Sequence, residues 1–230
     1  MESVPVLVAG GTGALGAAVL RELLDAGHPV TATWLVDKER ERIEADFGGD
    51  ERLTLVEANL MEPDATAAAV ASVDGLRAVV NLVGGYAGGA NVDETEPEEF
   101  ERMLALNLRP GFLLARAAMP LLVDAGGGAY VGVSSRAAVS PFAGAAGYIV
   151  GKAGVLAFVQ ALDAEYRDRG VRCNAVLPSV IDTPANRASM PDADHSKWVP
   201  PGQIARVVRF LVSDESAPLS GAAIPVYGLA

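Results

Sequence analysis

Several residue types are scarce in this chain of 230 residues, and each scarcity excludes a class of protein. The only cysteine, Cys173, cannot form an internal disulfide and has no cysteine partners for a zinc site, so no metal site is expected. The 18 Lys and Arg residues are outnumbered by 29 Asp and Glu residues, which argues against a nucleic-acid-binding surface. No apolar run approaches the ~20 residues of a membrane span. The start, Met1-Glu2-Ser3, lacks the basic residues of a secretory signal, so we expect a cytoplasmic protein without membrane or nucleic-acid partners.

Half of the residues are apolar, which favours a folded core, and short apolar runs alternate with longer helical stretches. This alternation predicts an α/β fold: a doubly wound Rossmann-type parallel sheet of about seven strands with helices on both faces. We expect a single domain over residues 1–230. The expected strands are residues 4–9, 30–36, 53–56, 78–83, 129–134, 171–177 and 222–226. The expected helices are residues 14–26, 38–47, 63–73, 96–123, 145–169 and 204–212, with a bend at Pro110; residues 84–89 and 179–201 are expected to be irregular.

A glycine-rich turn lies between the first expected strand and helix. Glycines there allow a positive φ, a close backbone approach to a diphosphate and tight packing of helix on strand. The exposed N–H groups at the start of the helix then attract an anion. The alternative is a glycine-rich turn without a ligand. The candidate dinucleotide contacts in this turn are Gly10, Thr12, Gly13, Ala14, Leu15 and Gly16.

A second group of residues indicates acid–base chemistry. Tyr148 and Lys152 are four residues apart, so they share one helix face. An ammonium close to a phenol favours the phenolate, so Lys152 is expected to lower the pKa of Tyr148 and fit it for proton transfer. Ser134 and Ser135 end the fifth expected strand, at the sheet edge where ligands of α/β proteins bind. From the residues alone, either serine could supply the hydroxyl that binds a substrate carbonyl. The tyrosine–lysine pair could equally be a pair on the surface of a helix.

Together these features resemble the short-chain dehydrogenase/reductase family, over essentially the whole chain. The step of 13 residues from Ser135 to Tyr148 is the family's common spacing and selects Ser135 over Ser134. The resemblance implies that Tyr148 exchanges a proton with the substrate oxygen, which Ser135 orients. It implies that Lys152 lowers the pKa of Tyr148 and binds the nicotinamide ribose, and that Asn107 helps to hold a proton-relay water.

The resemblance also places further cofactor contacts along the chain. They are Trp34, Asn59, Leu60, Asn81, Gly84, Tyr148, Lys152, Pro178, Ile181 and Thr183. The chain departs from the family pattern at three of these sites. Asn59 stands where an aspartate is usual, Leu82-Val83 replaces Asn-Ala after Asn81, and Ser179 replaces the glycine after Pro178.

The choice between the two nicotinamide cofactors depends on the end of the second strand. An acidic residue there binds the ribose 2′-hydroxyl of NAD(H), whereas a basic residue accepts the 2′-phosphate of NADP(H). The usual acid position falls on Trp34 or Leu35, which favours NADP(H) with Lys38 or Arg40. Asp37 supports the alternative, NAD(H).

The expected activity is hydride transfer between NAD(P)(H) and a small-molecule carbonyl or alcohol, with residues 179–201 as a lid over the substrate. Arg187 in this lid could bind a substrate anion or pair with a nearby acid, and Tyr86 is a further candidate lining residue. The alternatives are a catalytically silent NAD(P)-binding regulator and a structural subunit with the same fold. The resemblance and the apolar faces of helix 145–169 predict a homodimer or homotetramer.

Overall fold

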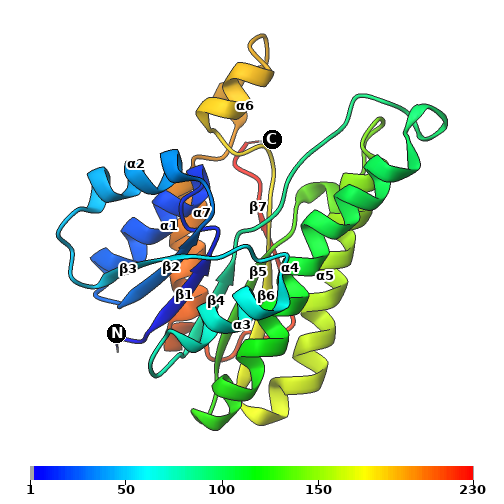
Figure 1. Cartoon of the computed structure of the whole chain (residues 1–230). Helices are drawn as coiled ribbons and strands as arrows, with labels where there is room; N and C mark the ends of the chain where they lie inside the picture. Colours follow the sequence, from blue (N-terminus) through cyan, green and yellow to red (C-terminus); the bar gives the residue numbers. More distant parts are fainter. Residues whose placement is uncertain (1–2, 230) are drawn as a thin grey trace.

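The computed structural model describes residues 3–229; residues 1, 2 and 230 of the expected domain lie outside this range. Its core is a parallel sheet of seven strands in the order β3-β2-β1-β4-β5-β6-β7 (Figure 1). The strands are β1 (Val6–Ala9), β2 (Val30–Trp34), β3 (Leu53–Glu57), β4 (Ala78–Asn81), β5 (Gly128–Val133), β6 (Val171–Pro178) and β7 (Ala223–Val226). The expected doubly wound Rossmann-type fold is therefore confirmed.

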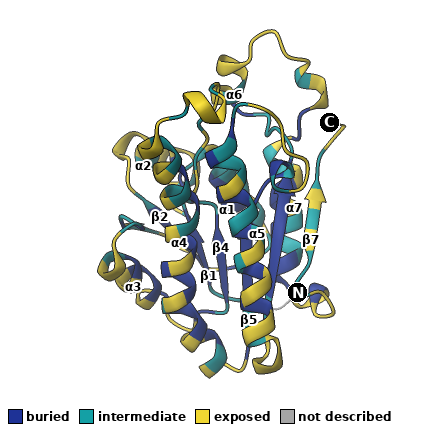
Figure 2. Ribbon diagram, turned by 90° about the vertical axis from the view of Figure 1, so that its right-hand side faces the viewer, coloured by how far each residue is buried: buried dark blue, intermediate teal, exposed yellow. Residues whose placement is uncertain are grey.

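Helices cover both faces of the sheet (Figures 1 and 2). One layer holds α1 (Ala14–Asp25), α2 (Asp37–Phe47) and α7 (Pro201–Val212). The opposite layer holds α3 (Pro63–Ala71), α4 (Pro97–Asp124) and α5 (Ala146–Tyr166). The α4 helix continues through Pro110, where a bend was expected. None of the helices within residues 3–229 combines the length and apolar character that crossing a bilayer requires.

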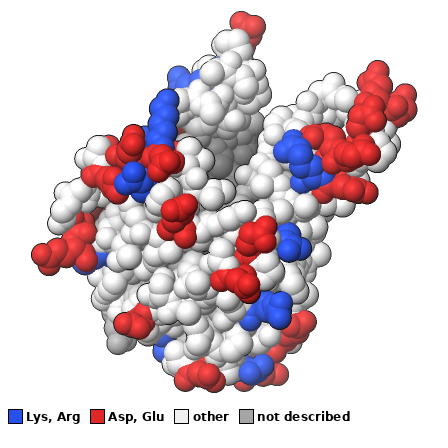
Figure 3. All heavy atoms as spheres, in the orientation of Figure 1, with Lys and Arg blue, Asp and Glu red and all other residues white. Residues whose placement is uncertain are grey.

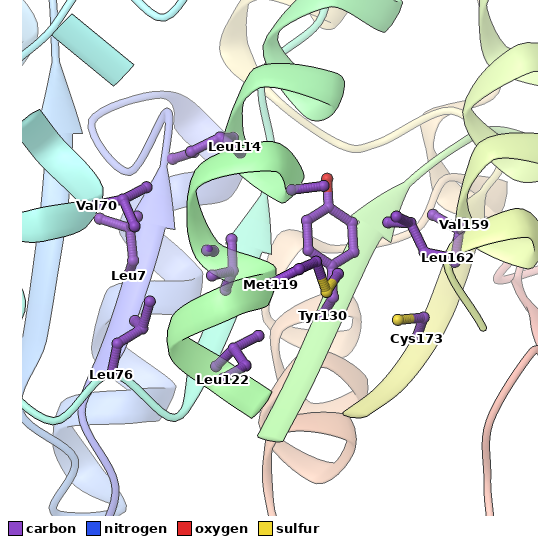
Figure 4. Packing of buried hydrophobic residues seen from close by; sticks show 14 of the residues in the cluster. Leu7, Val70, Leu76, Leu114, Met119, Leu122, Tyr130, Val159, Leu162 and Cys173 are labelled. Atoms are coloured by element: carbon purple, nitrogen blue, oxygen red, sulfur yellow. The ribbon is translucent and has the colours of Figure 1, made fainter. Parts of the chain in front are cut away.

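Burial on both faces explains why the strands are apolar along their whole length. In β1, Val6 and Val8 pack under the α1 layer, whereas Leu7 and Ala9 pack under the α4 layer. Figure 4 shows Leu7 with Tyr130 of β5 in the second of these cores. Because successive side chains of a strand point to opposite faces, a strand between two helical layers needs apolar residues at every position.

The parallel register brings the carboxyl ends of the strands to one edge of the sheet. Val6–Ala9 pairs in order with Ala78–Asn81, so the turns after β1 and β4 emerge side by side. The sheet order reverses between these two strands, and in open α/β sheets ligands bind at such a point. The segment 179–201 was expected to be irregular, but it contains α6 (Pro184–Ser189). Thr183 caps this short helix by accepting the Asn186 N–H at 3.2 Å, and Pro184 begins it.

Candidate active site

The turn after β1 presents bare backbone at the start of α1. Gly10 has a φ of +72°, and a Cβ on Gly16 would lie 2.3 Å from the Gly11 carbonyl oxygen, so both positions require glycine. Gly13 precedes α1 without a side-chain cap, and no acidic residue occupies the first turn. The first N–H groups of α1 are therefore left to an external acceptor, and the turn fits a dinucleotide diphosphate.

Helix α2 holds this turn in place through contacts that the sequence did not reveal. The buried Thr12 hydroxyl donates a hydrogen bond to Glu39 Oε2 at 3.1 Å, and Arg42 donates to the Thr12 carbonyl oxygen. The side chain of Thr12, a predicted cofactor contact, thus points toward α2. Because Glu39 is 27 residues away in the chain, no local pattern could have revealed this pair.

At the end of β5, backbone and side-chain bonds join the expected serines to α5. Lys152 Nζ donates to the Val133 carbonyl oxygen at 3.1 Å, and the Ser134 hydroxyl donates to the Lys152 carbonyl oxygen at 2.7 Å. Ser135 Oγ accepts the Ala137 N–H at 3.1 Å, which leaves its own proton free to donate. Ser134 is therefore committed to α5, whereas Ser135 keeps a donor for a ligand.

Burial is the largest cause of the pKa shifts of Tyr148 and Lys152. Burial lowers the pKa of Lys152 to about 8 from its ordinary value of 10.5. Burial also raises the pKa of the Tyr148 phenol above 10.0, and the nearby Ser135 hydroxyl opposes this rise. In this structure the ammonium donates to the Val133 carbonyl and desolvation disfavours the phenolate, so the expectation that Lys152 lowers the pKa of Tyr148 stays a prediction.

Asn107 of α4 joins the loop after β4 to the same cluster. Its amide nitrogen donates to the Gly85 carbonyl oxygen at 3.1 Å, and its oxygen accepts the Gly85 N–H at 3.3 Å. A Cβ on Gly84 would lie 2.7 Å from Asn107 Oδ1 and 2.8 Å from Lys152 Nζ. Three of the expected site residues, one each from the β4 loop, α4 and α5, therefore converge on one point.

Other expected cofactor contacts have structural partners of their own. Asn81 is buried, and its oxygen accepts the Val83 N–H at 3.1 Å. The oxygen of Asn59 accepts the Met61 N–H at 3.1 Å. The Leu60 side chain is buried in the core under α3 and α4, so only its backbone can face a ligand.

The segment after β6 places the remaining expected contacts below α6. Pro178 ends β6 and is buried. Ile181 forms a single bridge with Val199, and the buried Thr183 uses its hydroxyl oxygen to cap α6. These contacts position the chain at the carboxyl edge of the sheet, and contact with the cofactor remains a prediction for all three.

An arginine of α2 stacks on the tryptophan that ends β2. The Arg40 guanidinium lies 5.1 Å from the centroid of the Trp34 ring. Arg40 also contacts Glu44 at 2.7 Å and Asp37 at 3.7 Å. Leu35 and Val36, which follow Trp34, are exposed. The geometry therefore places both a cation and carboxylates where the cofactor's adenosine end is expected.

The sequence profile of the short chain dehydrogenase family matches residues 5–194. This chain belongs to that family. It is therefore an NAD(P)-dependent dehydrogenase, as the resemblance implied. Within residues 3–229, His, Cys, Asp and Glu side chains form no cluster of three or more that could hold a metal ion.

Known proteins resemble this chain over nearly its whole length. The chain is 32% identical to the 2,5-dichloro-2,5-cyclohexadiene-1,4-diol dehydrogenase LinX of Sphingobium indicum, over 96% of this chain and 94% of LinX. It is 29% identical to the D-threitol dehydrogenase of Mycolicibacterium smegmatis, over 96% of this chain and 90% of that enzyme. A short-chain type dehydrogenase/reductase from Mycobacterium ulcerans superposes with a TM-score of 0.93 at 25% identity, covering 100% of this chain and 90% of its own.

Proposed function

We propose that this dehydrogenase transfers hydride between NAD(P)(H) and a small-molecule ketone or alcohol, with Tyr148 as the general acid and base. The observation that carries the proposal is the convergence of Gly84, Asn107 and Lys152 on one point beside Ser135 and Tyr148. This cluster lies at the same sheet edge as the uncapped start of α1. Names of relatives such as LinX and the D-threitol dehydrogenase, each a dehydrogenase of an alcohol, agree with this reaction class.

Each side chain has a role that its surroundings support. Because burial raises the pKa of Tyr148, the phenol is neutral at pH 7 and can give its proton to the carbonyl oxygen during reduction. The free Ser135 proton would hold that same oxygen. Lys152, whose pKa is about 8, is mostly charged at pH 7 and has donors left for a ribose after binding the Val133 carbonyl.

The nicotinamide cofactor, when bound, supplies or accepts the hydride. In the direction of reduction, the carbonyl carbon would gain the hydride, and the carbonyl oxygen would gain the proton that Tyr148 gives up. The open N–H groups of α1 would hold the diphosphate, and Lys152, whose ammonium packs against the bare Gly84, would bind the nicotinamide end.

We infer a preference for NADP(H) from the stacked Arg40 and the apolar end of β2. Titration of the intrinsic fluorescence with NADPH and NADH tests this preference. Arg40→Ala is expected to weaken NADPH binding about tenfold through the loss of one charged contact, with NADH nearly unchanged. Tighter binding of NADH by the wild-type protein would contradict the preference and would indicate Glu39 or Asp37 as the ribose ligand.

The outer face of α4 and α5 supports a homodimer or homotetramer. Phe112 is half exposed, and its ring lies 6.3 Å from that of Phe158 on the neighbouring helix. Val150 is also exposed on α5. Sedimentation of the wild-type protein and of Phe112→Glu tests this assembly, and a monomeric wild type would contradict it.

Tyr148→Phe is the test of the catalytic proposal. The variant keeps the ring but loses the proton, so turnover of ketones is expected to fall about 10²- to 10⁴-fold. Binding of the nucleotide is expected to stay nearly unchanged. Retained turnover would exclude Tyr148 as the proton donor, and a wild-type protein that binds nucleotide without turnover would indicate a silent regulator.

A further inference from the structure

Tyr86 lies against the proposed proton donor, on the loop that joins β4 to α4. Its ring centroid is 5.0 Å from that of Tyr148, and the two ring planes meet at 80°. Tyr86 is 62% exposed, whereas Tyr148 is partly covered. The Tyr86 ring is therefore an exposed apolar surface directly beside the Tyr148 ring.

Contacts between two loops hold Tyr86 in this place. The Gly89 N–H donates to the Gly144 carbonyl oxygen at 2.7 Å, which joins the Tyr86 loop to the loop before α5. A Cβ on Gly88 would lie 2.5 Å from Tyr86 Oη and 2.8 Å from the Gly144 oxygen. The tyrosine hydroxyl thus packs against the bare backbone of Gly88, which restricts the ring to one side of the site.

The loops around the site carry more acidic than basic side chains. Segments 82–96, 134–145 and 179–200, all described in the structure, hold three Arg or Lys residues and six Asp or Glu residues. Two of the three cations are paired with carboxylates, Arg187 with Asp182 and Lys197 with Asp194. The third, Arg136, stacks on the Tyr227 ring. A phosphate or carboxylate would therefore meet twice as many acidic as basic side chains on these segments, which disfavours an anionic substrate.

Large apolar side chains are exposed on the same segments. Val139 and Phe142 lie on the loop after β5, and Met190 directly follows α6. Figure 3 shows a hollow between α6 and the loop that leads to α4, and its visible walls are mostly uncharged. Figure 3 shows acidic side chains gathered at the outer end of that loop. The acidic residues between β4 and α4 are Asp93, Glu94 and Glu96, and all three are exposed.

We propose that the substrate is an uncharged ketone or alcohol with an apolar body, and that Tyr86 contacts this body while Tyr148 exchanges the proton. This inference rests on the proposed function. It assigns Tyr86 to substrate recognition, so a change at Tyr86 acts mainly on KM, whereas a change at Tyr148 acts on kcat.

The experiment compares two ketone probes with the wild-type enzyme and its preferred nucleotide. The probes are cyclohexanone, which is uncharged, and acetoacetyl-CoA, which carries phosphates. We expect kcat/KM to be at least about tenfold higher for cyclohexanone. Tyr86→Ala is expected to raise KM for cyclohexanone about two- to tenfold, the range of one aromatic contact, while Tyr86→Phe stays close to wild type. Val92→Ala, on the same loop at a residue that is 73% exposed, is the control and should change neither constant.

Three results overturn the inference. Equal or better use of acetoacetyl-CoA shows that an anionic substrate is accepted. An unchanged KM in Tyr86→Ala shows that the ring does not contact the substrate. Nucleotide binding without reduction of either probe, or of a wider set of charged and uncharged ketones, refutes the proposed function itself and the inference with it.

Discussion

Replacing Lys152 by methionine is expected to stabilise the protein at pH 7 while abolishing turnover. The lysine is 7% exposed, and its ammonium has one hydrogen-bond partner, the Val133 carbonyl oxygen. A buried charge with so few partners destabilises the fold, and active sites retain such groups for function. Methionine has a similar length and no charge, so it can occupy the same space.

The size of the expected stabilisation follows from the pKa of Lys152. Burial lowers the pKa of Lys152 from 10.5 to about 8, and one pKa unit corresponds to ~1.36 kcal/mol. The charged lysine therefore costs the folded protein about 3 kcal/mol at pH 7. Loss of the bond to Val133 offsets ~1 kcal/mol of the gain, which leaves a net stabilisation of about 2 kcal/mol. For a chain of this size, that difference raises Tm by about 4–8 °C.

The stability difference between Lys152→Met and the wild type should depend on pH. Between pH 8 and pH 10.5 the unfolded lysine binds its proton while the folded lysine has released it, so the wild-type protein gains stability as the pH rises. The advantage of Lys152→Met is therefore complete below pH 8 and is mostly gone at pH 10. Other titrating groups are common to both proteins and cancel in the difference.

Urea unfolding of both proteins at pH 7 and pH 10, at one protein concentration, measures this difference. Lys38→Met is the matched control, because it makes the same substitution at an exposed side chain. A Lys152→Met variant that is less stable than wild type at pH 7 would refute the reasoning. So would a stability difference that is the same at both pH values.

Three further outcomes are expected. Gly16→Ala places a Cβ 2.3 Å from the Gly11 carbonyl oxygen, so it should destabilise the fold by about 1–3 kcal/mol and weaken nucleotide binding in a fluorescence titration; Gly202→Ala, with open space around it, should do neither. Asn107→Ala removes the amide bonds to Gly85 and should lower kcat about tenfold or more with a smaller effect on KM, and an unchanged kcat would contradict its positioning role. Because burial raises the pKa of Tyr148, alcohol oxidation should increase from pH 7 to pH 10; a plateau below pH 9 would show a lower pKa in the working enzyme.

The strands and most helices could be predicted from the sequence because their patterns are local. Val6–Ala9 is a short apolar run, and Ala78–Asn81 is apolar up to its last residue; burial on two faces makes such runs continuous. The α6 helix escaped prediction because six residues carry no apolar period and its cap, Thr183, resembles any loop threonine. The sequence pattern did not predict the order of the strands, since the step from β3 to β4 across β2 and β1 is a property of the assembled sheet.

For the site, the sequence alone determined which residue types are present and which of them share a helix face. The pair Tyr148 and Lys152 follows from a spacing of four residues on α5, and Ser135 from the resemblance to the family. Only the tertiary structure decided the protonation of that pair and the position of Tyr86 above it. The physical reason is that spacing along a helix is set by backbone geometry, whereas desolvation and packing depend on atoms contributed by every element that surrounds the site.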